Sequence, residues 1–201
     1  MQVYSIRPTS FFANFTKYDL QSIVGNRSFS SAVASNEAGN GANAKVNWVA
    51  VDDIAHVAAA ALYGNHAIET IYEEQKELHV RRNSHPDPAF TVVLDVTGGE
   101  DNTLSPADVA AVCTEILTGI INKTKDINHK EKDINKDHTV IETTVICNVA
   151  PLPSGFPGAD SYAALFIFLR NGGFNASTNV VERVLGRPPK TFRDFLSTCL
   201  S

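Results

Sequence analysis

Apolar positions along the chain recur with two periods, which predict alternating strands and helices. Three short apolar runs, Val3–Ile6, Val46–Val51 and Phe90–Val96, predict strands, and Thr139–Val149 predicts a fourth. The run at 90–96 is nearly apolar throughout, so we expect a strand buried on both faces. Because helical patterns separate these runs, the chain is predicted to be an α/β protein with a partly parallel sheet.

Helices are predicted where apolar residues recur at three- and four-residue spacing. The expected helices are Phe11–Val24, Ile54–Leu62, Pro106–Ile121, Ala159–Arg170, Val180–Leu185 and a last one that opens near Thr191 and runs through Leu200.

Several of these helices carry start signals in the residues before them. Asp52 or Asp53 is expected to cap the helix that begins at Ile54. Ser105 is expected to cap the helix that begins at Pro106. Asn179 with Glu182 has the spacing of a capping box.

Three segments lack a clear period. Gly25–Lys45 predicts a long loop, which is either disordered or a cover over a site. The polar residues 66–89 are expected to be irregular, with a possible helical turn at 68–77. Asn122–His138 is a charged stretch in which Lys-Asp-Ile-Asn occurs twice, and it predicts a solvated insertion.

Composition and charge exclude several classes of protein. The 201 residues are 43% hydrophobic and 19% charged, which is typical of one globular domain. The net charge of −5 argues against nucleic-acid binding, because phosphate neutralisation requires a basic face. No apolar run approaches the roughly 18 residues of a membrane span. The polar start predicts no signal peptide, so we expect a cytoplasmic protein.

Candidate chemistry is sparse. The three cysteines are far apart and have no zinc-ligand spacing, so no metal site is predicted. No Gly-rich phosphate loop occurs, and Gly98-Gly99 is followed by Glu100 and Asp101, whose charges repel a phosphate. The Tyr-x-x-x-Lys pair of short-chain dehydrogenases is absent as well. The catalytic residues are therefore unknown.

The segment after the first strand is the best candidate for a site. Pro8 is expected to stop regular strand pairing, and the residues after it should face a pocket. Asn14 either caps the following turn or lines that pocket. Trp48 is either a core residue or a platform for a ligand.

Four ordered motifs resemble the NmrA-like proteins, which are atypical short-chain dehydrogenases. The motifs are RPTSFFANF at 7–15, WVAVDDIA at 48–55, the unit from Leu94 through Leu117, and NVVERVLGRPPKTFRDF at 179–195. The last motif is similar to fungal members near the ergot-alkaloid dehydrogenase branch. The resemblance covers the second half of such proteins.

The resemblance implies an incomplete Rossmann-like fold that lacks the N-terminal dinucleotide-binding half and keeps a small α/β substrate-binding portion. Residues 1–201 would be one truncated domain. Its residues 1–65 would be a remnant of the Rossmann core, and residues 66–201 the substrate-binding portion with an insertion at 122–138.

The resemblance also implies a site. Residues near the nicotinamide end of NADP or NAD would be Pro8, Thr9, Ser10 and Phe11. Residues lining the substrate side would be Phe12, Asn14, Phe15 and Trp48. In this family hydride comes directly from the cofactor, and the protein orients the substrate.

The function implied is that of an NAD(P)-dependent oxidoreductase of fungal secondary metabolism, reducing a C=N, C=C or carbonyl group of a small, alkaloid-like molecule. The alternatives are a non-catalytic NmrA-like regulatory protein and an inactive truncated gene product. Expected partners are the substrate and either a second copy or a separate N-terminal half, with no nucleic acid and no membrane. An unpaired edge at Val3–Ile6 would favour dimerisation.

Overall fold

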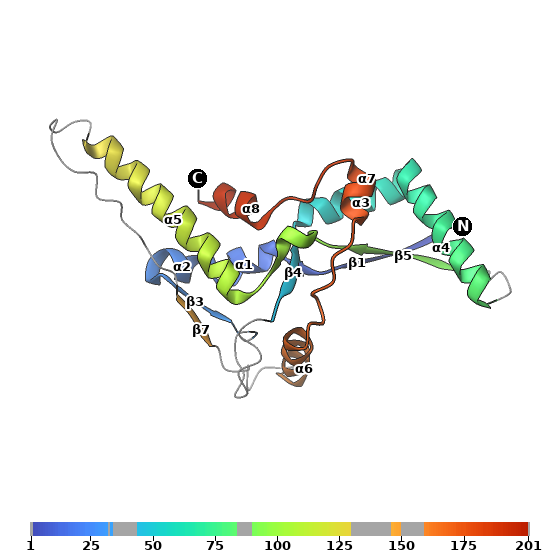
Figure 1. Cartoon of the computed structure of the whole chain (residues 1–201), viewed down its shortest axis with the longest axis horizontal. Helices are drawn as coiled ribbons and strands as arrows, with labels where there is room; N and C mark the ends of the chain where they lie inside the picture. Colours follow the sequence, from blue (N-terminus) through green and yellow to red (C-terminus); the bar gives the residue numbers. More distant parts are fainter. Residues whose placement is uncertain are drawn as a thin grey trace. The chain divides into compact units, whose positions relative to one another are not determined.

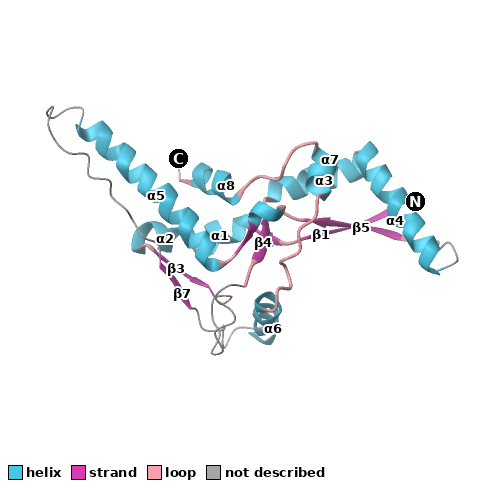
Figure 2. Cartoon of the chain, viewed as in Figure 1, coloured by secondary structure: helices cyan, strands magenta, loops and turns pink. Residues whose placement is uncertain are grey.

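The computed structural model describes residues 2–31, 33, 44–83, 90–129, 146–149 and 159–200. Figures 1 and 2 show its strands: β1 Val3–Pro8, β2 Ser10–Phe11, β3 Ser28–Ser31, β4 Val46–Val49, β5 Thr91–Val96, β6 Thr103–Leu104 and β7 Ile146–Val149. The helices are α1 Phe12–Tyr18, α2 Leu20–Asn26, α3 Val51–Tyr63, α4 His66–Asn83, α5 Pro106–His129, α6 Ala159–Arg170, α7 Val180–Leu185 and α8 Phe192–Cys199, with a 3-10 turn, η1, at Glu100–Asn102.

The strands form three small sheets in which parallel pairing predominates. β1 pairs with β5 in parallel, from Val3 opposite Thr91 to Pro8 opposite Val96. β2 and β4 are parallel, as are β3 and β7, and β6 joins the sheet next to β4. The predicted α/β class with parallel pairing is therefore confirmed.

The chain divides into two compact units that alternate along the sequence. Unit 1 consists of Met1–Ala13, Asn47–Thr103 and Phe174–Phe192, and unit 2 consists of Asn14–Val46, Leu104–Gly173 and Arg193–Ser201. The division of the sequence at residue 65 into a Rossmann remnant and a substrate portion stays a prediction.

The core of unit 1 lies between the β1–β5 sheet and helices α3, α4 and α7. Its nine buried members are Val49, Val57, Ile68, Ile71, Val92, Leu94, Val96, Val181 and Val184, with Tyr4 and Ile6 of β1 packed against them. On β5 buried residues alternate with half-buried ones. The expectation that this strand is buried on both faces was therefore wrong, because one face packs on helices and the other carries side chains such as Asp95.

β1 ends at Pro8, where we expected its regular pairing to stop. Pro8 is itself still paired, as the last residue of the strand, and lies opposite Val96. The next residue, Thr9, donates its backbone N–H to the Val96 carbonyl oxygen at 3.2 Å. Because successive residues of a strand alternate their bonding direction, the backbone nitrogen of Pro8 points away from β5, where no donor is needed.

The largest error of sequence interpretation concerns residues 66–83, which form the 18-residue helix α4 and not an irregular segment. Only Ile68 and Ile71 are fully buried, both in the first two turns. The remaining turns are mostly polar, so the apolar stripe is too short to display a helical period.

Other boundaries also moved. The expected helix at 11–24 is two helices, α1 and α2, separated at Asp19. The loop expected at 25–45 contains β3, and α5 continues through residues 122–129 of the expected insertion. The rest of that insertion, and most of the strand expected at 139–149, lie outside the described residues.

The expected helix caps were confirmed at Ser105, confirmed in position but without a side-chain bond at Asn179, and wrong at Asp52 and Asp53. Ser105 and Asp108 exchange hydrogen bonds in a capping arrangement, with the Asp108 N–H donating to Ser105 Oγ at 3.2 Å. Helix α3 has Ala50 as its N-cap, so neither Asp52 nor Asp53 caps it. Asn179 is the N-cap of α7, but its side chain makes no capping bond.

Unit 2 holds a half-buried carboxyl group, Asp19, whose charge disfavours the charged form of a buried thiol, Cys113. Burial raises the pKa of the Asp19 carboxyl to about 6. Burial, followed by the nearby Asp19 charge, raises the pKa of the Cys113 thiol to about 12. Cys113 is therefore an uncharged, inert thiol at neutral pH.

Replacing Asp19 by asparagine is expected to stabilise the fold at pH 7.5 and to have little effect near pH 4. The folded pKa of about 6 lies above the ordinary 3.8, so the folded chain holds the proton more tightly. The stability from this group is fully present below about 3.8 and is lost as pH rises through about 6. Urea unfolding from pH 4 to 8 measures the difference. Asp160→Asn, at an exposed position of α6, is the matched control.

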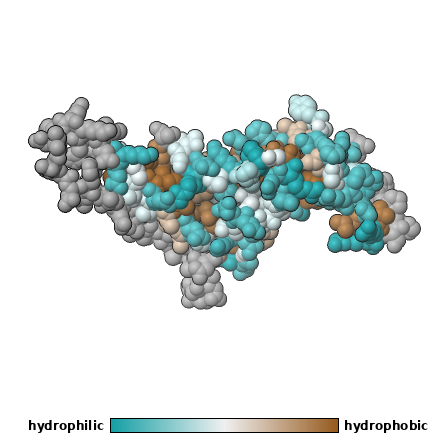
Figure 3. Space-filling model, turned by 45° about the horizontal axis from the view of Figure 1, so that its top comes forward, coloured by the Kyte–Doolittle hydropathy of each residue, from teal (hydrophilic) through white to brown (hydrophobic). Residues whose placement is uncertain are grey.

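The described surface is mainly hydrophilic on the face drawn in Figure 3, with hydrophobic residues in separate patches. Helix α6 exposes several large apolar side chains, namely Tyr162, Leu165, Ile167 and Phe168. Among the described helices, none combines the length and the apolarity needed to cross a membrane.

Candidate functional site

The predicted site residues of unit 1 gather where parallel strands end. Pro8 ends β1 and Val96 ends β5, and these two residues lie opposite each other. Ser10 and Phe11 of β2 then pair with Trp48 and Val49 of β4. In open α/β sheets, ligands bind at the carboxyl ends of the strands. This edge is therefore the candidate site.

A buried asparagine, Asn47, joins the strand ends. Its Oδ1 accepts hydrogen bonds from Thr9 Oγ1 at 3.0 Å and from the Gly98 N–H at 2.8 Å. Its Nδ2 donates to the Gly99 carbonyl at 2.7 Å and to Thr103 Oγ1 at 2.8 Å. We call Asn47 and these four partners the Asn47 cluster. The amide is saturated, since an asparagine side chain offers two donors and two acceptor sites.

A second buried amide, Asn102, ties the same turn to the segment before α8. Its Nδ2 donates to the carbonyl oxygens of Gly98 at 2.6 Å and Lys190 at 3.0 Å. Its Oδ1 accepts the Phe192 N–H at 2.8 Å. The turn after β5 is thus held by two asparagines, and its backbone polar groups are paired inside the protein.

Asp53 is a buried carboxylate that holds two parts of the fold together. Its side chain is 1% exposed and accepts hydrogen bonds from Arg187 Nη2 at 2.7 Å and from the Lys190 N–H at 2.8 Å. These partners lie in the Gly-Arg-Pro-Pro-Lys segment between α7 and α8. Asp53 therefore anchors that segment to the first turn of α3, and both of its oxygens are in use.

The four residues that were predicted to lie near the cofactor are all found at this edge of the sheets. Pro8 closes β1, and both the N–H and the hydroxyl of Thr9 are engaged, with Val96 and Asn47. Ser10 and Phe11 form β2 and are half-buried. Their assignment to the nicotinamide end of a cofactor stays a prediction.

The four predicted substrate-side residues do not share one environment. Phe12 is fully buried, and its ring centroid lies 5.5 Å from that of Phe192. Trp48 is half-buried on β4, and its indole nitrogen has no hydrogen-bond partner among the described residues. Asn14 is exposed and Phe15 is buried, and both belong to unit 2. Their role in substrate binding stays a prediction.

Sequence reasoning missed Asn47, Asn102 and the anchoring role of Asp53. A weak signal was present for Asn47, which is a polar residue inside the apolar run VNWVAV. A polar side chain in such a run is expected to be buried and fully hydrogen-bonded.

The chemistry available at this edge is that of binding. Asparagine, threonine and glycine backbone groups make up the Asn47 cluster, and none of them titrates near neutral pH. Over the described ranges, His, Cys, Asp and Glu side chains form no group of three that could hold a metal ion.

Comparison with known proteins gives a fold and no family. No family model and no curated protein matches the chain. Among solved structures it is similar to a nucleoside-diphosphate-sugar epimerase from Staphylococcus aureus, with 11% identity and a TM-score of 0.56. The likeness covers 96% of this chain and 51% of that one, so the chain spans about half the epimerase's length. The chain thus shares the fold of part of that protein.

Proposed function

We propose that the chain is the substrate-side part of an NAD(P)-dependent oxidoreductase of the NmrA-like type. The observation that carries this proposal is the edge at which β1, β2, β4 and β5 meet. There the Asn47 cluster holds Ser10, Phe11 and Trp48 in one small region of unit 1. The partial likeness to the fold of a nucleoside-diphosphate-sugar epimerase supports it.

The turn after β5 does not fit the pyrophosphate of a dinucleotide. An anion site needs unpaired backbone N–H groups, usually at a helix start after a Gly-rich turn. In the turn after β5, the Gly98 N–H is already bonded to Asn47, and the exposed side chains of Glu100 and Asp101 follow. We therefore expect this chain by itself to bind NADP or NAD very weakly.

The residues of this chain would bind and orient a substrate, while the reducing chemistry belongs to the nicotinamide group. Half-buried Phe11 and Trp48 offer apolar contact, while the indole nitrogen of Trp48 is itself buried and has no partner among the described residues. These rings suit a flat molecule with a C=N, C=C or carbonyl group, such as an alkaloid precursor of fungal secondary metabolism. We place the enzyme in the cytoplasm.

A non-catalytic NmrA-like regulatory protein is the second candidate. The observation that favours it is the neutral, saturated character of the Asn47 cluster, which contains no proton donor or acceptor suited to catalysis. A protein of this kind would bind a partner and would not respond to small reducible compounds.

Trp48 provides the test, because it is the only tryptophan in the chain. We expect flat cyclic imines or enones to change its fluorescence saturably, and micromolar NADPH to show no binding by calorimetry. Ser10→Val should weaken the response to imines, because the added methyl groups fill space beside Trp48. Thr70→Val, at an exposed position of α4, is the matched control.

Two results would contradict this picture. Micromolar affinity for NADPH would show that the pyrophosphate argument is wrong. A fluorescence response that is absent, or that Ser10→Val leaves unchanged, would place the substrate elsewhere and would favour the regulatory protein.

A further inference from the structure

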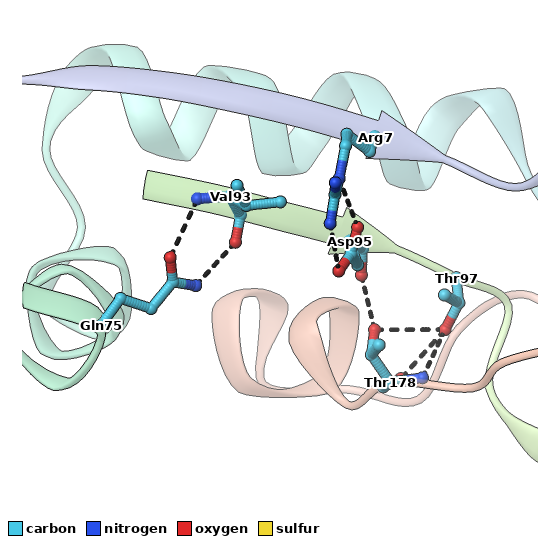
Figure 4. A network of polar contacts seen from close by, with 6 residues as sticks. All are labelled: Arg7, Gln75, Val93, Asp95, Thr97 and Thr178. Carbon is cyan, nitrogen blue, oxygen red and sulfur yellow. Dashed lines mark hydrogen bonds and ion pairs between the residues drawn. The ribbon is translucent and has the colours of Figure 1, made fainter. Parts of the chain in front are cut away.

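The β1–β5 sheet has two edges, and the outer edge of β5 is covered by side chains. Gln75 of α4 accepts the Val93 N–H at 2.9 Å and donates to the Val93 carbonyl at 2.7 Å, as a neighbouring strand would (Figure 4). Thr178 Oγ1 donates to the Asp95 carbonyl at 2.5 Å. These bonds leave no room for another strand beside β5.

The outer edge of β1 is different. Thr9 donates its N–H to Val96, so the odd-numbered residues of β1 bond toward β5. The even-numbered residues therefore direct their backbone groups to the opposite edge, where Tyr4 and Ile6 each present an N–H and a carbonyl. Among the described residues, β1 pairs with no strand other than β5. The sheet can thus grow on this side alone.

We propose that β1 pairs antiparallel with β1 of a second copy of this chain, across a twofold axis at Ser5. In this register Tyr4 lies opposite Ile6 of the other copy, and each pair exchanges two backbone hydrogen bonds. Four bonds form, and they use every outward N–H and carbonyl of the two residues. The inference is independent of the proposed function.

The backbone disfavours the registers that are shifted toward the end of β1. A shift by two residues toward the end of β1 places Tyr4 opposite Pro8, which has no N–H to donate. A further shift places Arg7 opposite Arg7, and like charges directly opposite each other destabilise a strand pair. The pairing centred on Ser5 places Pro8 opposite Gln2, outside the strand, and keeps the two Arg7 side chains apart.

The side chains are also complementary in this register. On the core face, Tyr4 and Ile6 are half-buried against the unit 1 core and would meet each other across the axis. On the other face, Val3, which is 43% exposed, would lie opposite Arg7, whose guanidinium already pairs with Asp95 at 2.8 Å. No uncompensated charge is placed against another.

The pairing also explains how so small a sheet persists. Two strands alone are marginal in water, and parallel strands normally occur inside larger sheets. Pairing through β1 makes a four-stranded sheet in the order β5-β1-β1-β5, closed at both ends by Gln75 and Thr178. No further chain can add, so the assembly is a dimer and not a filament.

The direct test is a disulfide cross-link at the axis. In an antiparallel pair without hydrogen bonds, facing Cα atoms lie about 4.5 Å apart, which is within the range that a disulfide spans. We expect Ser5→Cys, in a Cys147→Ser and Cys199→Ser background that leaves buried Cys113 as the remaining native thiol, to form covalent dimers on mild oxidation. Val3→Cys should not, because its two copies lie about 13 Å apart along the strands.

Charge variants test the same register without a cross-link. Val3→Arg places a second arginine opposite Arg7 of the other copy, and the twofold axis repeats this contact. The dimer dissociation constant should therefore rise about tenfold. Val3→Glu faces the same arginine with the opposite charge and should leave dimerisation unchanged or strengthen it. Sedimentation at several concentrations measures both, and circular dichroism confirms that both variants keep the fold.

Three outcomes would overturn the proposal. The first is a wild-type chain that remains monomeric at high concentration, which would leave the β1 edge to a strand of another protein. The second is equal cross-linking of Ser5→Cys and Val3→Cys. The third is a dimer whose affinity is the same for Val3→Arg and Val3→Glu.

Discussion

Asn47→Ala is expected to lower the free energy of unfolding by about 4 kcal/mol. The substitution removes all four side-chain hydrogen bonds of the Asn47 cluster. The backbone N–H of Gly98 loses its amide partner in the interior, and a buried unpaired polar group costs about 1–3 kcal/mol. The Gly99 carbonyl keeps only the long bond from Thr103 Oγ1 at 3.4 Å. Because many domains are stable by only about 5–15 kcal/mol, the variant should be marginally folded.

Chemical denaturation of the two proteins, followed by circular dichroism, measures this loss. Asn14→Ala is the matched control, since Asn14 is exposed on α1 and should change stability by less than about 0.5 kcal/mol. An equal effect of the two substitutions would mean that the Asn47 cluster contributes little to the fold.

The elements that could be predicted from the sequence are those specified by neighbouring residues. Helix α6 spans Ala159–Arg170 and α7 spans Val180–Leu185, as the periodicity and the glycine after α7 indicated. Gly186 has a φ of 66°, a backbone conformation that glycine adopts without strain. Local signals of this kind act within a few residues, so a sequence displays them directly.

The elements that could not be predicted depend on distant partners. Helix α4 looks irregular because its polar turns are held by contacts such as that between Gln75 and Val93. The paired residues of β1 and β5 are 88 positions apart in the chain, and all six residues of each strand are paired. The sequence of one segment alone does not indicate either contact.

The candidate site shows the same division. The segment after β1 was recognised as important, and Thr9 does lie in the Asn47 cluster. The residue that organises the cluster, Asn47, was not recognised, because its four partners come from residues 9 and 98–103. Phe12 was expected to contact a ligand, but its side chain is fully buried. An aromatic side chain suits a hydrophobic core as well as a binding site, so its residue type does not distinguish the two.

The turn after β5 connects the site to the fold, and Gly98 is its most constrained residue. Gly99 has a φ of 75°, which suits a turn. Gly98 has a further constraint, because its backbone lies directly against the Trp48 carbonyl oxygen. Close approach of two backbones, rather than turn geometry, requires glycine there.

Gly98→Ala is therefore expected to be at least as damaging as Asn47→Ala, with a loss of about 4 kcal/mol or more. A Cβ at this position would lie 1.7 Å from the Trp48 carbonyl oxygen and 2.8 Å from Asn102 Cβ. A backbone atom cannot turn aside as a flexible side chain can, so β4 and the turn after β5 must separate. That separation also breaks the bond from the Gly98 N–H to Asn47.

Two readouts distinguish this local separation from a general loss of folding. Thermal unfolding gives the stability, and the fluorescence of Trp48 should shift toward the emission of a solvated indole before the main transition. Gly25→Ala is the matched control: a Cβ there has no atom within 4 Å, and alanine in α2 should add about 0.5–1 kcal/mol. If Gly98→Ala were as stable as the wild type, β4 and the turn after β5 could not be in the close contact on which the candidate site depends.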